Sequence, residues 1–220
     1  MESPQNLQKR PRELSPEQQQ ENDARTMNWK RVKMAQRRKS RQSLIVAISQ
    51  YDKLDCLPGA AVDEEKALRC CDDLGFETVS VKGRVTLEAL EERVEEFLEK
   101  VKAAAEQHTN PVALVFIACH GMQLNAEDRM PRLLMSDSCI HGNGYLASPG
   151  FDVESNLVKG LNSIHPRAPG ILSSILVLDC CREHRHCYTF RSTSAQPMEA
   201  RKCLKSLSND FYFVFACDPG

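Results

Sequence analysis

Runs of aliphatic residues alternate along the chain with segments in which apolar residues recur every three or four positions. An unbroken aliphatic run is typical of a strand buried on both faces of a parallel sheet, whereas the wider spacing is typical of an amphipathic helix. The pattern predicts strands over residues 43–49, 76–81, 112–118, 133–135, 175–178 and 211–216, and helices over 63–74, 86–102, 151–161 and 200–207. This alternation indicates a three-layer α/β domain around a mainly parallel sheet.

Chemically reactive residues follow two of the predicted strands. The tripeptide Cys-His-Gly at 119–121 comes directly after the strand over 112–118, and Asp-Cys-Cys-Arg at 179–182 comes directly after the strand over 175–178. Right-handed connections place the carboxyl ends of parallel strands on one edge of the sheet, where ligands bind in open α/β folds. We therefore expect both segments at the same edge.

An imidazole and a thiol at one edge are the two groups that a cysteine peptidase needs. His120 can take the proton of the Cys181 thiol or hold the thiolate as an ion pair, and later protonate the leaving amine. The tetrahedral intermediate needs backbone N–H donors, for which Gly121 and Cys181 itself are the natural pair. Taken singly, His120 is better explained as a hydrogen-bonded core histidine and the cysteines as small buried hydrophobic residues, but the pairing favours catalysis.

Composition argues against several other classes of protein, namely nucleic-acid-binding, membrane and secreted proteins. The formal net charge is −1, so the whole chain has no electrostatic bias toward nucleic acid or acidic lipid. Neither the apolar segment of a signal peptide nor a run of the ~18 apolar residues that span a bilayer occurs. The ten cysteines cluster in or next to predicted strands and helices rather than at the spacings of a disulfide framework, which predicts reduced thiols and a cytoplasmic protein.

The first 42 residues differ from the rest. Residues 1–42 are polar and poor in aliphatic side chains, which predicts a disordered tail, and the folded domain is expected over 43–220. Within the tail, residues 30–41 are strongly basic, a candidate nuclear-localisation signal or phosphate-binding patch. A solvated linker is the better explanation, because the stretch is short and only Trp29 supplies a nearby aromatic ring.

Four segments resemble the caspase-like clan of cysteine peptidases, closest to its paracaspase and metacaspase branch. Residues 43–49 followed by 57–63 resemble the first strand, loop and acid-bearing helix start of that branch, and 74–76 its helix-to-strand turn. Residues 116–121 resemble its strand and His-Gly pair, and 178–182 its Asp-x-Cys-Arg motif. The resemblance covers about residues 43–220. It implies a caspase-like fold with His120 as general base and Cys181 as nucleophile, and it leaves Cys180 on the variable position of the motif.

The resemblance also implies a pocket for the residue before the cut, lined by Asp63 and Asp179. Two carboxylates select a cation, so cleavage is expected after Arg or, less well, Lys. True caspases cut after Asp and carry a Gln-Ala-Cys motif, which this sequence lacks. The alternatives are a cap for Asp179 and a helix-N-terminal acid for Asp63, the latter nearly as well supported as the pocket role. The implied partner is a protein or peptide with a basic residue before the cut; no cofactor, metal, membrane or nucleic-acid partner is expected.

The chain departs from that branch in three respects. Cys119 stands where Gly or Ser is common. The acids Glu127, Asp128 and Asp137 are too few and too scattered to predict the calcium site that metacaspases can carry. The family domain normally continues past the strand at 211–216 with a further strand for dimerisation and another pocket acid. We expect this chain to lack that part, and to form a homodimer only where the further strand is present.

Two other functions are compatible with the sequence. An inactive caspase-like scaffold would bind partners through the basic tail, although the intact His120 and Cys181 oppose it. A metal site could use the cluster Cys180, Cys181, His184, His186 and Cys187, but zinc sites prefer separated Cys-x-x-Cys or His-x-x-x-His pairs. We therefore rank metal binding last.

Overall fold

The computed structural model describes residues 19–20, 23, 25–29, 32, 35, 39–123, 130–139, 150–165, 172–180, 183–184 and 211–215. The chain divides into two units, residues 1–36 and 37–220. The first strand begins at Arg41, two residues before the start of the predicted strand. In the part of the chain that the structure describes, no helix is long and apolar enough to cross a membrane.

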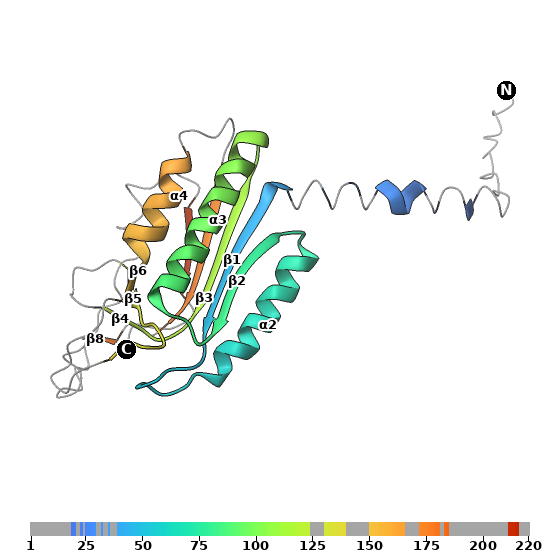
Figure 1. Cartoon of the computed structure of the whole chain (residues 1–220). Coiled ribbons are helices and arrows are strands. Elements are labelled where there is room, and N and C mark those ends of the chain that lie inside the picture. Colours follow the sequence, from blue (N-terminus) through green and yellow to red (C-terminus); the bar gives the residue numbers. More distant parts are fainter. Residues whose placement is uncertain are drawn as a thin grey trace, which may run out of the picture. The chain divides into compact units, whose positions relative to one another are not determined.

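The main sheet contains five parallel strands among the described residues, in the order β2-β1-β3-β7-β9. Their bounds are β1 Arg41–Ile48, β2 Glu77–Gly83, β3 Val112–Ala118, β7 Ser173–Asp179 and β9 Phe211–Phe215 (Figure 1). The predicted parallel sheet is confirmed, and β1, β3 and β7 are neighbours whose carboxyl ends share one edge.

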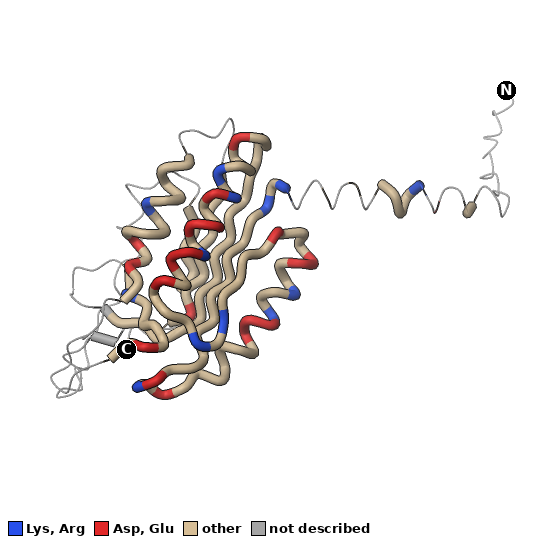
Figure 2. The backbone as a smooth tube through the Cα atoms, viewed as in Figure 1, with Lys and Arg blue, Asp and Glu red and all other residues tan. Residues whose placement is uncertain are grey.

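Helices cover the sheet on two faces. On one face lie α3 (Leu87–Gln107), the π-helical turn η1 (Val153–Val158) and α4 (Lys159–Ile164), side by side in Figure 1. Their apolar residues form one core cluster with alternate residues of the strands. Helix α2 (Pro58–Asp73) covers β1 and β2 on the other face, with a smaller cluster around Ile45, Cys71 and Phe76. Charged residues lie mainly on the helices, and the strands of the main sheet carry few of them (Figure 2).

Two helix starts differ from the prediction. The helix predicted from residue 63 begins five residues earlier, because Pro58 is the first residue of α2. Proline fits there because the first N–H of a helix has no partner within the helix to lose. The helix predicted from Phe151 begins only at Val153, because Phe151–Asp152 forms the short strand β6. Asp152 then caps η1, accepting a hydrogen bond from the Ser155 N–H at 2.9 Å.

A small second sheet continues from the carboxyl edge of the first. It has the order β6-β5-β4-β8, with β4 at Gly121–Gln123, β5 at Arg132–Leu133 and β8 at Glu183–His184. Strand β4 follows β3 after two residues and pairs in parallel with β8, which follows β7. The two chain segments that follow β3 and β7 are therefore paired with each other both before and after residues 119–121 and 180–182.

Candidate active site

His120 lies two residues beyond the end of β3 and is held from several directions. Its backbone N–H donates to the Tyr51 hydroxyl at 2.9 Å, and its carbonyl accepts from the Leu134 N–H at 2.8 Å. The Tyr51 and His120 rings lie 4.7 Å apart between centroids, tilted by 54°. His120 is half-buried, and these contacts fix the position of its backbone.

The hydrogen bond of the His120 ring determines which nitrogen can act as a base. Nε2 of His120 lies 2.8 Å from the backbone carbonyl oxygen of Asp55. A carbonyl oxygen only accepts hydrogen bonds, so Nε2 must carry the proton, and in a neutral ring the lone pair then lies on Nδ1. The Asp55 carbonyl thus orients the ring and would stabilise an imidazolium.

Tyr51 helps to hold His120 in place. It comes from the loop after β1 and is buried. Burial, with a smaller contribution from Cys119, raises the pKa of the Tyr51 hydroxyl far above its usual range. The residue therefore stays a neutral phenol that accepts the His120 N–H. Sequence reasoning missed both Tyr51 and Asp55, and their only signal was a place in a loop after a strand that ends at this edge.

Replacing Tyr51 with phenylalanine keeps the ring but removes the acceptor of the His120 N–H. An N–H that loses its partner in a partly buried site costs about 1–2 kcal/mol, so we expect the free energy of unfolding to fall by that amount in urea denaturation of the full chain. Tyr212, exposed on β9, is the matched control, and Tyr212→Phe should change stability by less than about 0.5 kcal/mol. Equal effects of the two variants would contradict the support role of Tyr51.

The peptide between His120 and Gly121 has a defined orientation. Its carbonyl points toward the side of β5 and accepts from the N–H of Leu134, the residue after that strand. The structure contains no cis peptide bond among the described residues, and in a trans peptide the N–H points opposite to the C=O. The Gly121 N–H therefore points away from β5, toward the side on which β8 lies.

Asp63 and Asp179 line one groove. The groove has a volume of about 600 Å³ and lies between α2 and the strands β3 and β7. Asp179 is the last residue of β7 and shares the α2 face with Val177, since side chains alternate along a strand. Leu114 and Phe116 of β3 are part of the apolar lining. The structure thus brings together the two acids that the sequence analysis paired.

The alternative role for Asp63 does not hold in the structure. Because α2 begins at Pro58, Asp63 lies in the second turn, and the first turn carries no acid. The helix dipole acts mainly within the first turn, so it gives Asp63 little stabilisation. The carboxylate instead pairs with the exposed Lys66, Nζ to Oδ1 at 3.1 Å.

Several predicted residues lie outside the described part of the chain. These are Cys181, Arg182, Glu127, Asp128, His186 and Cys187. Cys180 is described and is buried in the core cluster on the α3 face, opposite the groove. Among the described residues, no group of three His, Cys, Asp or Glu side chains is placed to hold a metal ion.

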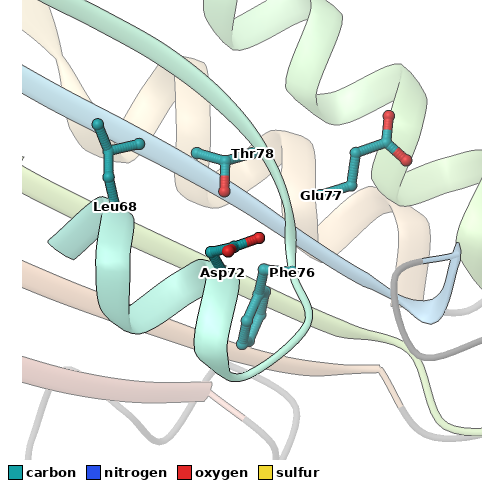
Figure 3. Close-up of a pocket in the computed structure, with 5 residues that line it drawn as sticks. All are labelled: Leu68, Asp72, Phe76, Glu77 and Thr78. Atoms are coloured by element: carbon teal, nitrogen blue, oxygen red, sulfur yellow. The ribbon is translucent and has the colours of Figure 1, made fainter. Parts of the chain in front are cut away.

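A second hollow lies at the other end of α2. It has a volume of about 560 Å³ and is lined by Leu68, Asp72, Phe76, Glu77 and Thr78 (Figure 3). In the figure Glu77 points away from α2. This hollow is at the amino ends of the strands and has neither a thiol nor an imidazole in its lining, so it lacks the groups for catalysis.

Three solved structures are similar to this chain over part of their length. The chain matches pro-Sf-caspase-1 with a TM-score of 0.51 at 14% identity, over 84% of this chain and 63% of that one. It matches caspase-1 from Spodoptera frugiperda with a TM-score of 0.49 at 17% identity, over 84% and 61%. It matches the Drosophila initiator caspase Dronc with a TM-score of 0.41 at 15% identity, over 64% and 48%. The chain therefore spans between 48% and 63% of the length of these structures.

A comparison with curated protein sequences returned no match. The comparison with family models did: the model of the caspase domain matches residues 40–220, which is most of the chain and includes every strand described here. A family model that matches this much of the chain shows the family, and the chain belongs to the caspase domain family, a family of cysteine-type peptidases.

Proposed function

We propose that the protein is a cysteine endopeptidase that cleaves after Arg, and less well after Lys, through a Cys181–His120 dyad. The specificity allies it with the paracaspase and metacaspase branch rather than with peptidases that cut after Asp. The observation that carries the proposal is His120: its ring is oriented by the Asp55 carbonyl, with Nδ1 as the available base, at the edge where β7 ends.

Pairing on both sides of the dyad supports the role of Cys181. Ala118 is paired with Asp179 at the end of the main sheet, and Met122 is paired with Glu183 in the second sheet. Between these pairs lie two segments of three residues each, 119–121 and 180–182. His120 belongs to the first segment and Cys181 to the second. Two equal segments held together at both ends favour contact between an imidazole on one and a thiol on the other.

In the proposed reaction, Nδ1 of His120 takes the thiol proton and the thiolate of Cys181 attacks the scissile carbonyl carbon. The oxyanion binds the N–H groups of Gly121 and Cys181, the former supported by its direction toward the β8 side. The imidazolium then protonates the leaving amine as the C–N bond breaks. Water, activated by the same imidazole, hydrolyses the thioester and restores the thiol.

Charge in the groove supports the proposed specificity. Asp63 and Asp179 supply two carboxylates, and the remaining lining is largely apolar apart from Lys66. A guanidinium can bind a carboxylate through two parallel hydrogen bonds, whereas an ammonium acts as a point charge. Arg is therefore expected to be preferred over Lys, and an acidic side chain would be repelled.

A panel of fluorogenic peptides that differ only before the scissile bond tests this function. We expect hydrolysis after Arg, slower hydrolysis after Lys and none after Asp. A preference for Asp would overturn the pocket assignment. If an arginyl peptide with a thiol-reactive group fails to label Cys181 in the purified protein, the inactive scaffold would be the better account.

Lys66 competes with the substrate for Asp63, because its ammonium already pairs with that carboxylate. Exposed pairs of this kind contribute about 0.2–1 kcal/mol, so Lys66→Gln should lower KM for the arginyl peptide by roughly two- to fivefold and leave kcat unchanged. Lys102, in an equivalent exposed pair with Glu99 on α3, provides the control. An unchanged KM in Lys66→Gln would remove Asp63 from the pocket.

A further inference from the structure

Two cysteines lie next to each other where β3 and β7 end. Ala118 is paired with Asp179, and the Cys119 N–H donates to the Asp179 carbonyl at 3.3 Å, so Cys119 and Cys180 are the next pair outward. Alternation along each strand puts both side chains on the α3 face, with Ile117 and Leu178. Both are thiols in the structure and both belong to one core cluster, 3% and 2% exposed.

The spacing of this pair suits a covalent link. Neighbouring strands lie about 4.8 Å apart, and disulfides join Cα atoms about 4.4–6.8 Å apart. The two residues stand one position past the last pair of the ladder, so their Cα atoms are expected to keep roughly the spacing of neighbouring strands.

We propose that Cys119 and Cys180 form a reversible disulfide, which makes this pair a redox-modification site between the two strands that carry the proposed dyad. The oxidant is a low-molecular-weight disulfide such as oxidised glutathione. One cysteine thiolate attacks it and releases the first glutathione thiolate; the other cysteine then attacks the mixed disulfide and releases the second. Two protons pass from the cysteines to the two glutathione molecules, and the balance is two thiols oxidised for one disulfide reduced.

The consequence for activity rests on the proposed function, whereas the formation of the bond does not. Cys119 immediately precedes His120, and Cys180 immediately precedes Cys181. Both cysteines also contribute to raising the pKa of the Tyr51 hydroxyl, which accepts the His120 N–H, so both lie near the group that holds His120. Drawing the sulfurs into bonding distance moves the backbone next to both dyad residues. A displacement of about 1 Å can cost on the order of 10²-fold in rate, so the disulfide form should be the less active one.

Mass spectrometry of the full-length Cys181→Ala variant tests the bond without relying on catalysis. Trypsin releases the peptides 103–129 and 168–182, and in this variant Cys119 and Cys180 are their only cysteines. After incubation with oxidised glutathione and blocking of remaining thiols, we expect these peptides to be linked, and dithiothreitol to separate them. Adding Cys119→Ser or Cys180→Ser should abolish the link. Recovery of both residues as blocked thiols or as separate glutathione adducts would overturn the proposal.

Activity measurements separate this proposal from the proposed function. Oxidised wild type should lose about 10²-fold in kcat/KM and regain it with dithiothreitol, while Cys119→Ser should keep its activity under the same oxidation. Equal losses in both proteins would place the inhibition on another cysteine and overturn the switch. A linked peptide in a protein with no peptidase activity before oxidation would instead confirm the bond and reject the proposed function.

Discussion

Replacing His120 with alanine is expected to lower kcat for an arginyl peptide by about 10²–10⁴-fold, the usual range for loss of a general acid–base group. KM should change little, because the imidazole acts on the thiol and the leaving amine and makes no contact with the substrate's basic side chain. The structure motivates this prediction through the Asp55 carbonyl, which leaves Nδ1 as the base. Steady-state kinetics on purified protein measures both constants.

The control for this variant is His108→Ala. His108 caps α3 just before β3 begins, at the opposite edge of the sheet from His120. It should leave both kinetic constants unchanged, and circular dichroism should show both variants folded. Residual kcat within tenfold of wild type in a folded His120→Ala protein would exclude His120 as the base.

Asp179→Asn is expected to lower kcat/KM for an arginyl peptide by about 10²-fold. Removing one partner of a desolvated charge pair costs about 2–5 kcal/mol of binding free energy. A 10²-fold fall in kcat/KM corresponds to about 2.7 kcal/mol, which lies within this range. Asp63→Asn should cost less, because Lys66 already occupies that carboxylate in the free protein. The same assays with a citrulline peptide, which is neutral but similar in shape, should show almost no difference between wild type and either variant.

Asp72→Asn provides a matched control for the groove. Asp72 lies on the same helix as Asp63 but lines the hollow at the other end of α2 (Figure 3). It should leave the preference for Arg unchanged. If Asp72→Asn and Asp179→Asn reduced kcat/KM equally, the effect would come from overall charge or stability, and Asp179 would lose its assignment to the pocket.

Strands were predictable where burial on both faces leaves an unbroken aliphatic run. The run at 112–118 predicted β3 to the residue, and the run at 175–178 identified β7 to within two residues at one end and one at the other. Short strands were harder to predict: β4 contains only three residues and was not predicted. So few residues carry no periodicity, and what holds β4 is pairing with β5 and β8 from elsewhere in the chain.

The candidate site divides in the same way. His120 and Asp179 could be placed because each follows a recognisable strand, and parallel strands end at one edge. Tyr51 and Asp55 could not, since one acts through a hydroxyl and the other through a backbone carbonyl that any residue could supply. The helix-dipole role for Asp63 had to be discarded once α2 was seen to begin at Pro58.

By itself, then, the sequence determined the α/β class, the parallel sheet and the edge at which reactive residues gather, because these follow from local hydrophobic periodicity and chain direction. Only the tertiary structure decided how the imidazole is oriented, that two acids share one groove, and that Cys119 and Cys180 face the same side. Those depend on contacts between segments far apart in the chain, and on backbone groups that every residue possesses, so no pattern of side chains along the sequence encodes them.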